Sequence, residues 1–256
     1  MHILVCNDDG YKAPGLAVLV NVLKEQYHKI TVVAPRDNKS GCGMALSLRQ
    51  SIKVEEVSDN TFVVDGTPAD CAYIGLQNLV SEPVDLVISG INNGANLADD
   101  ILYSGTFAAA MEARRLYLPS IALSVANQHV KHYETAAYIA SELANEMPHL
   151  EYKSLLSVLN VNVPDVPTAQ LRGLKATVLG ERLAPVKPND VSAEHTQEDN
   201  VKRFVLGPVG DFDRRRRKVM ADFEAVEQGF VSVTPLTTYL EDRAYVQDTQ
   251  TWLDNI

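Results

Sequence analysis

Short apolar runs recur at regular intervals through the first two thirds of the chain. They are rich in Val, Ile and Leu, and polar or glycine-bearing segments bound them: residues 2–7, 30–34, 85–89, 120–125 and 155–161. Runs of this length and composition are typical of buried strands. Near-continuous apolar character, without alternation, further favours strands that are covered on both faces.

Segments with helical periodicity lie between these runs, at residues 14–23, 68–79, 106–116 and 133–146. In the first of them Pro14 suits the start of a helix, and Leu16, Leu19 and Leu23 lie on one face. Alternating strands and helices imply right-handed crossovers. We therefore predict a Rossmann-like, three-layer α/β domain with a mostly parallel sheet.

The pattern loosens after about residue 165. Residues 171–178, 201–206 and 230–234 predict further strands, and residues 222–228 a short helix. Near the N-terminus, residues 52–57 and 61–65 predict a hairpin. We predict one domain over 1–256, in which residues from about 180 to 256 form a β-rich extension used in oligomerisation.

Composition and charge narrow the function classes. A chain of 256 residues with 46% hydrophobic content can bury one sizeable core. Lys and Arg total 23 against 33 Asp and Glu, a net charge of −10, which argues against binding nucleic-acid polymers or anionic membranes. No run of about 18 apolar residues and no targeting segment occurs. With three cysteines and no even disulfide framework, these features predict a cytoplasmic protein with reduced thiols.

Oxygen-bearing side chains follow the predicted strands at their carboxyl ends, where open α/β sheets bind ligands. Asp8 and Asp9 follow the first strand, Ser40 lies after the second, and Asn92 follows the strand at 85–89. Adjacent carboxylates repel unless a cation is present, and oxygen ligands favour Mg²⁺, Mn²⁺ or Ca²⁺. The alternative is that the two aspartates cap a helix or stabilise a turn.

A possible anion cradle lies at Ser104, Gly105 and Thr106, before an Ala-rich helical segment. Backbone amides and the helix dipole at such a position attract phosphate. A plain N-cap by Ser104 or Thr106 is the alternative. An acidic metal pocket and an anion cradle on one sheet edge together favour phosphoryl transfer.

The chain resembles the SurE (survival protein E) family of nucleotidases in an ordered set of motifs. These are NDDG at 7–10, GTPADC at 66–71, SGINNGANL at 89–97, YSGT at 103–106 and GFVSVTPL at 229–236. The set covers essentially the whole chain, and it is far more specific than any one motif alone.

The resemblance implies a metal site and a phosphate site. The metal ligands would be Asp8, Asp9, Ser40 and Asn92, holding one Mg²⁺ or Mn²⁺ per subunit. The phosphate contacts would be Asn96, Ser104, Gly105 and Thr106. It also implies 5'-nucleotidase activity on nucleoside monophosphates, with some activity on 3'-nucleotides, other phosphate esters or polyphosphate. A homodimer or homotetramer with exchanged C-terminal elements is implied as well.

The mechanism that we expect is in-line attack by a metal-activated water, with Asp8 or Asp9 accepting a proton. The sequence leaves open which aspartate is the base. Direct attack by Asp8 to give an aspartyl-phosphate is an alternative within the same class.

A receiver-like phosphate- and metal-binding signalling module without hydrolase activity is the alternative from another class. Such modules need a phosphorylatable aspartate after a central strand, where this chain has residues 89–92, SGIN. No GxGxxG follows the first strand, which disfavours a dinucleotide-binding protein.

Two C-terminal features carry smaller predictions. The basic run at 214–217 predicts a solvated hairpin tip, with attraction of anionic substrate as the alternative. Trp252 and Leu253 predict a docked terminal helix.

Overall fold

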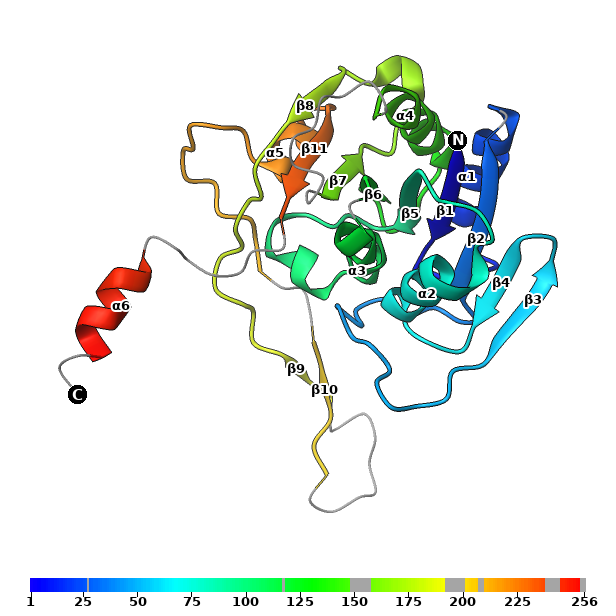
Figure 1. The fold of residues 1–256 in the computed structure, drawn as a ribbon. Helices are drawn as coiled ribbons and strands as arrows, with labels where there is room; N and C mark the ends of the chain where they lie inside the picture. Colours follow the sequence, from blue (N-terminus) through cyan, green and yellow to red (C-terminus); the bar gives the residue numbers. More distant parts are fainter. Residues whose placement is uncertain are drawn as a thin grey trace.

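The central feature of the fold is a nine-stranded sheet with the order β3-β4-β2-β1-β5-β6-β7-β11-β8 (Figure 1). The structure is a computed structural model that describes residues 1–26, 28–116, 118–147, 158–191, 201–206, 210–237 and 245–253. Six neighbouring strands run parallel: β4 (Thr61–Val64), β2 (Lys29–Pro35), β1 (His2–Cys6), β5 (Leu86–Asn93), β6 (Ser120–Val125) and β7 (Val158–Val163). The predicted parallel α/β sheet is confirmed.

The remaining strands flank this parallel block. On one side β3 (Val54–Ser58) pairs antiparallel with β4 and closes the predicted hairpin. On the other side β11 (Val231–Leu236) runs antiparallel to β7, and β8 (Leu174–Ala176) runs parallel to β11. Because β11 lies inside the sheet, part of the predicted extension is integral to the main domain.

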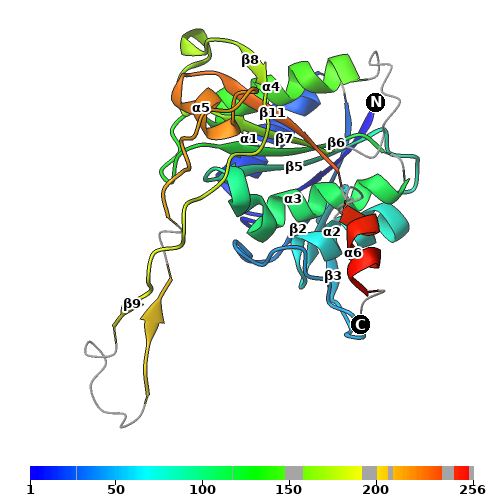
Figure 2. The ribbon, with the colours of Figure 1, turned by 90° about the vertical axis from the view of Figure 1, so that its left-hand side faces the viewer.

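Helices cover both faces of the sheet (Figure 2). The helices α1 (Pro14–Glu25) and α4 (Tyr133–Glu146) pack on one face, and α2 (Pro68–Ile74) and α3 (Gly105–Met111) on the other. Strand β1 shows why: Ile3 and Val5 join the core beneath α1 and α4, whereas Leu4 and Cys6 face α2 and α3. Successive side chains of a strand point to opposite faces, so an unbroken apolar run builds two cores.

Irregular helical segments extend these elements. The π-helix η1 (Gly75–Leu79) continues α2, and the 3-10 helix η3 (Glu112–Leu116) continues α3. A 3-10 helix that the sequence did not predict, η2 (Ala98–Tyr103), leads into α3. Another, η5 (Thr168–Gln170), precedes β8. No helix among the described residues is long and apolar enough to cross a membrane.

Most predicted elements are confirmed, with one change near the site. Strand β5 continues to Asn93, beyond the predicted end at residue 89, because Asn92 and Asn93 still pair with Ser124 and Val125 of β6 after a register shift. The first residues of the strand predicted at 155–161 lie outside the described part of the chain.

The remaining elements of the C-terminal third include one helix on the sheet and others that stand away from it. Strands β9 (Asn189–Asp190) and β10 (Phe204–Val205) pair antiparallel in an arm that projects from the domain (Figure 1). Helix α5 (Asp222–Glu227) packs on β11. Helix α6 (Val246–Leu253) has no buried residue, so the predicted docking of Trp252 and Leu253 is not seen within the described chain.

The basic run at 214–217 is solvated as predicted, since three of its four arginines are exposed, but it does not form a hairpin. Residues 210–221 form no strand and contain only isolated bridges, so the predicted hairpin tip is wrong. Acidic neighbours hold the guanidinium groups instead: Arg214 pairs with Glu227, and Arg215 with Asp213. Part of the charge of the run is therefore neutralised by neighbouring carboxylates.

Candidate active site

Three loops at the carboxyl edge of the sheet are tied together around Asp8 and Asp9. The backbone N–H of Asn93, the last residue of β5, donates to Asp9 Oδ2 at 2.9 Å. From the loop after β2, the Asn38 amide donates to Asp9 Oδ1 at 3.3 Å, and the Lys39 N–H donates to the Asp8 carbonyl at 2.7 Å. Strand ends that are distant in sequence are thereby brought to one point.

Asp8 is buried, with 3% of its surface exposed, and it lies beside a second carboxylate. Burial raises the pKa of Asp8 to about 6, and the charge of Asp9 adds to this rise. The Thr106 hydroxyl, which donates to Asp8 Oδ1 at 2.6 Å, opposes the rise. Burial also raises the pKa of Asp9, and the hydrogen bond from the Asn93 N–H opposes this rise. A cation here would relieve both carboxylates.

Gly105 lets helix α3 approach Asp8 closely. A Cβ atom at residue 105 would lie 2.8 Å from Asp8 Cβ and 3.0 Å from Asp8 Oδ2. A larger residue would therefore displace the carboxylate. Thr106 is fully buried and its hydroxyl is committed to Asp8, so its side chain supports the acidic pair.

The capping alternatives have different outcomes for the two motifs. The N-cap of α1 is Ala13, which makes no side-chain cap, so the aspartates do not cap the following helix. Ser104, in contrast, is the N-cap of α3, because its hydroxyl accepts from the Phe107 N–H at 3.0 Å. What this turn can offer an anion is backbone N–H groups, which lack intrahelical partners in the first turn of a helix.

Neutral oxygen donors lie next to the acidic pair. The Asn92 amide nitrogen donates to the Gly94 carbonyl at 2.7 Å, which leaves its carbonyl oxygen as the atom that Asn92 can offer a cation. The Ser40 N–H donates to Asn38 Oδ1 at 2.7 Å, in the loop that also contacts Asp9. Two carboxylates with neutral oxygens suit a hard divalent ion. Within the described residues, no cluster of three or more His, Cys, Asp or Glu offers another kind of metal site.

A cleft of about 1070 Å³ opens over these groups. Five of the predicted site residues line it: Asp8, Ser40, Asn92, Asn96 and Ser104. The other three contact these residues or their neighbours: Asp9 bonds to the Asn93 N–H, and Gly105 and Thr106 lie against Asp8. Four further lining side chains were not singled out in the sequence: Asn127, Arg182, Lys187 and Phe212.

A model of one protein family, described as Survival protein SurE, matches residues 3–185. The chain belongs to the SurE family. A solved structure of the family has the same fold. The crystal structure of the SurE protein from Aquifex aeolicus superposes on this chain with a TM-score of 0.85, covering 99% of this chain and 100% of that chain, at 32% sequence identity.

Curated SurE relatives are similar along nearly their whole length. The protein from Legionella pneumophila strain Philadelphia 1, named 5'-nucleotidase SurE, is 43% identical over 92% of this chain and 90% of its own. The 5'-nucleotidase SurE of Ruthia magnifica is 40% identical over 100% of both chains.

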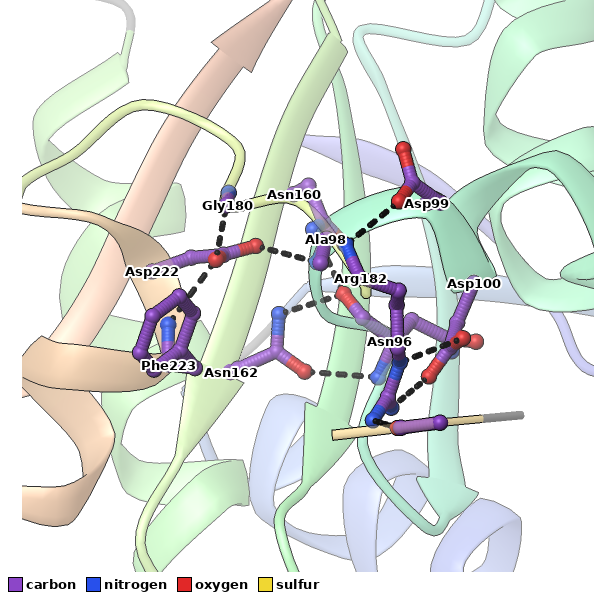
Figure 3. A network of polar contacts seen from close by, with 11 residues as sticks. Asn96, Ala98, Asp99, Asp100, Asn160, Asn162, Gly180, Arg182, Asp222 and Phe223 are labelled. Atoms are coloured by element: carbon purple, nitrogen blue, oxygen red, sulfur yellow. Dashed lines mark hydrogen bonds and ion pairs between the residues drawn. The ribbon is translucent and has the colours of Figure 1, made fainter. Parts of the chain in front are cut away.

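The Asn96 segment shows what sequence reasoning missed in this SurE fold. The Asn96 N–H donates to Asn162 Oδ1 at 2.8 Å, and the Asn96 carbonyl accepts from the amides of Asn160 and Asn162 (Figure 3). Asn96 Nδ2 donates to the Ser124 hydroxyl at 2.8 Å, which leaves its second hydrogen for a ligand. The signal was present: two asparagines two positions apart in the apolar run VLNVNV must share one face.

Proposed function

We propose that this chain is a divalent-metal-dependent 5'-nucleotidase that hydrolyses nucleoside monophosphates. The observation that carries the proposal is the buried Asp8 carboxylate beside Asp9, at the floor of a cleft that also presents Asn96 and Ser104. Such a pair is costly unless a cation binds, and an anion site beside it suits a phosphate ester. The names of the curated relatives support the same activity.

Asp8, Asp9, Ser40 and Asn92 would hold one Mg²⁺ or Mn²⁺. Bound there, the ion would neutralise phosphate charge and lower the pKa of water. The protein positions the other participants. Asp8 or Asp9 accepts a proton from the attacking water, and the Thr106 hydroxyl fixes the orientation of Asp8.

The phosphate would be bound by hydrogen-bond donors that lie near the acidic pair. The free hydrogen of Asn96 Nδ2 and the N–H groups at the start of α3 would donate to its oxygens. These donors are fixed before substrate arrives, because Ser124 orients Asn96 and Ser104 caps the helix. Fixed donors need little reorganisation as charge develops in the transition state.

Direct attack by Asp8 is distinguishable from attack by water. Acid-quenching the enzyme during turnover of a ³²P-labelled mononucleotide traps any aspartyl-phosphate. We expect no label on the protein. If the wild-type protein carries the label and Asp8→Asn does not, the covalent route is established instead.

The experiment that tests the function is phosphate release from a panel of 5'- and 3'-mononucleotides and polyphosphate. Activity should disappear with EDTA and return with Mg²⁺ or Mn²⁺, and 5'-mononucleotides should be the best substrates. If a folded preparation releases no phosphate with either ion, the enzyme proposal fails and a receiver-like binding module becomes the better account.

We also propose that the C-terminal extension joins subunits into a homodimer or homotetramer. Large apolar side chains lie exposed on its elements: Phe204 at 53%, Leu206 at 82% and Trp252 at 63%. Exposed apolar groups gathered on projecting elements are typical of association surfaces. Sedimentation of the full chain should give a dimer or tetramer, and Leu206→Asp or Trp252→Asp should lower the mass. A monomeric wild type would contradict this.

A further inference from the structure

One buried carboxylate joins the Asn96 segment to the C-terminal third of the chain. Asp222, at the start of α5, has none of its surface exposed. Its Oδ2 accepts from the Ala98 N–H at 2.8 Å, and its Oδ1 accepts from the N–H groups of Gly180 and Phe223 at 2.9 and 2.8 Å (Figure 3). The three donors come from three separate segments, so the carboxylate holds them together.

Ala98 is a position where the backbone needs such support. Its φ is +52°, in the left-handed region that non-glycine residues seldom adopt. Ala98 is also fully buried, and it begins η2, two residues after Asn96. A strained conformation persists when its surroundings determine it. The Asp222 bond is one such determinant.

A second connection runs beside the first. The Arg182 N–H donates to Asp99 Oδ2 at 2.7 Å, and the Arg182 guanidinium forms a bidentate pair with Asp100 (Figure 3). The guanidinium also lies over Phe212, 4.1 Å from the ring centroid, and Phe212 stacks on Phe223 at 4.3 Å. Residues 98–100 are thus bonded to the C-terminal third at each position.

The Asn96 segment is therefore fixed from two sides. From the sheet, Asn160 and Asn162 bond to the backbone of Asn96. From the C-terminal third, Asp222 bonds to Ala98. We propose that Asp222 is a positioning residue for phosphate-ester hydrolysis, acting through Ala98 to aim the Asn96 amide into the cleft. The inference rests on the proposed function, and Asp222 lies beyond residue 185, where the family match ends.

The substitution Asp222→Asn separates this role from general support of the fold. All three partners of the carboxylate are donors, whereas an asparagine offers one acceptor oxygen. The best fit keeps that oxygen on Gly180 and Phe223 and turns the NH₂ group toward the Ala98 N–H. The variant then loses the link to the Asn96 segment while its two other bonds remain.

Thr177→Val is the matched control. Thr177 is buried in the same region, and its hydroxyl bonds to the hydroxyls of Ser232 and Thr234 at 2.9 and 2.7 Å. Valine has nearly the same shape as threonine, so the variant loses buried hydrogen bonds while the hydrogen bond to Ala98 remains. A change seen in both variants would reflect loosening of the C-terminal third as a whole.

The kinetic experiment uses the full-length wild type, Asp222→Asn and Thr177→Val with AMP and Mn²⁺. We expect Asp222→Asn to lower kcat/KM by about 10- to 100-fold, the equivalent of one buried hydrogen bond to a charged group. The loss should fall mainly on KM, because a phosphate donor binds the ground state too. Thr177→Val should keep kcat/KM within about twofold, and half-activating Mn²⁺ should be unchanged in both.

A double-mutant cycle shows whether Asp222 acts through Asn96. In an Asn96→Ala background, Asp222→Asn should cost less than about twofold, because the group that it positions is already gone. The full loss in that background, or a wild-type kcat/KM for folded Asp222→Asn, would overturn the proposal.

Hydrogen exchange gives a readout that needs no activity. In Asp222→Asn, the amides of residues 96–100 should exchange at least about tenfold faster than in the wild type, while those of Thr177→Val should not. This arm stays informative if the wild type proves not to be a phosphatase. Unchanged exchange in Asp222→Asn would overturn the positioning role by itself.

Discussion

Two buried aspartates in this molecule lie in opposite electrostatic settings. Burial raises the pKa of both Asp8 and Asp222. Around Asp222 the neighbours are donors, and three backbone N–H groups satisfy its oxygens. Asp8 receives the Thr106 hydroxyl, with weaker help from backbone amides, and it faces the like charge of Asp9.

This difference agrees with the two proposed roles, in which Asp222 positions the backbone and Asp8 binds a cation. A buried carboxylate surrounded by amide donors is satisfied by the protein alone. A buried carboxylate next to another carboxylate is satisfied only when a proton or a metal ion joins the pair. The contrast therefore supports the proposals that the strand-end loops bind the ligand and that Asp222 has a positioning role.

The largest expected effect comes from neutralising Asp8. Asp8→Asn should lower mononucleotide hydrolysis about a thousandfold or more, because it removes a side chain proposed both as a metal ligand and as a candidate base. Phosphate release measures this, with Asp59→Asn as the control, since Asp59 lies exposed in the β3-β4 turn. Activity within tenfold of the wild type in a folded Asp8→Asn would refute the site.

The same substitution should make the metal-free protein more stable. The folded-state pKa of Asp8 is raised, from 3.8 to about 6, so the folded protein holds the proton more tightly than the unfolded chain. Its contribution to stability is therefore full below pH 3.8 and is lost as the pH rises through 6. At pH 7 in EDTA, the free energy of unfolding of Asp8→Asn should be about 2–3 kcal/mol higher than that of the wild type.

Urea unfolding at pH 7 and at pH 3.5 measures this difference. The difference in the free energy of unfolding should shrink toward zero at pH 3.5. At that pH residue 8 is neutral in both folded proteins, as a protonated aspartate in the wild type and as asparagine in the variant. A variant that is less stable than the wild type at pH 7 would show that the Thr106 bond outweighs the burial of charge.

The smallest expected effect concerns the basic run at 214–217. Arg214 is already paired with Glu227. Arg214→Gln should therefore leave both KM for AMP and the melting temperature unchanged, since exposed ion pairs contribute little. A KM that rises and depends more weakly on salt would instead show that the run attracts anionic substrate.

The sequence predicts the loops of the site better than the contacts that hold them. Asp8, Ser40 and Asn92 follow from one rule, that ligands gather where parallel strands end. The bond between Asp222 and Ala98 spans 124 positions along the chain, and no local pattern indicates it. The continuation of β5 to Asn93 was missed for a related reason. Its last residues are polar and give no local strand signal, and they are in the strand because they pair with β6.

The C-terminal third was harder to predict because its strands are short. Strands β9 and β10 pair over two positions, which is too few for a periodic signal. Strand β11, in contrast, alternates over six residues and was predicted, although its place inside the main sheet was not. Local patterns give a strand, whereas its neighbours depend on the whole chain.

Calorimetric titration of Mn²⁺ into the metal-free protein at pH 7 tests the contrast between the two aspartates most directly. Wild type and Asp222→Asn should bind one ion per chain with affinities within about threefold of each other, and Asp8→Asn should show no saturable binding. Unchanged binding in Asp8→Asn, or its loss in Asp222→Asn alone, would contradict the assignment of the cation to the strand-end loops.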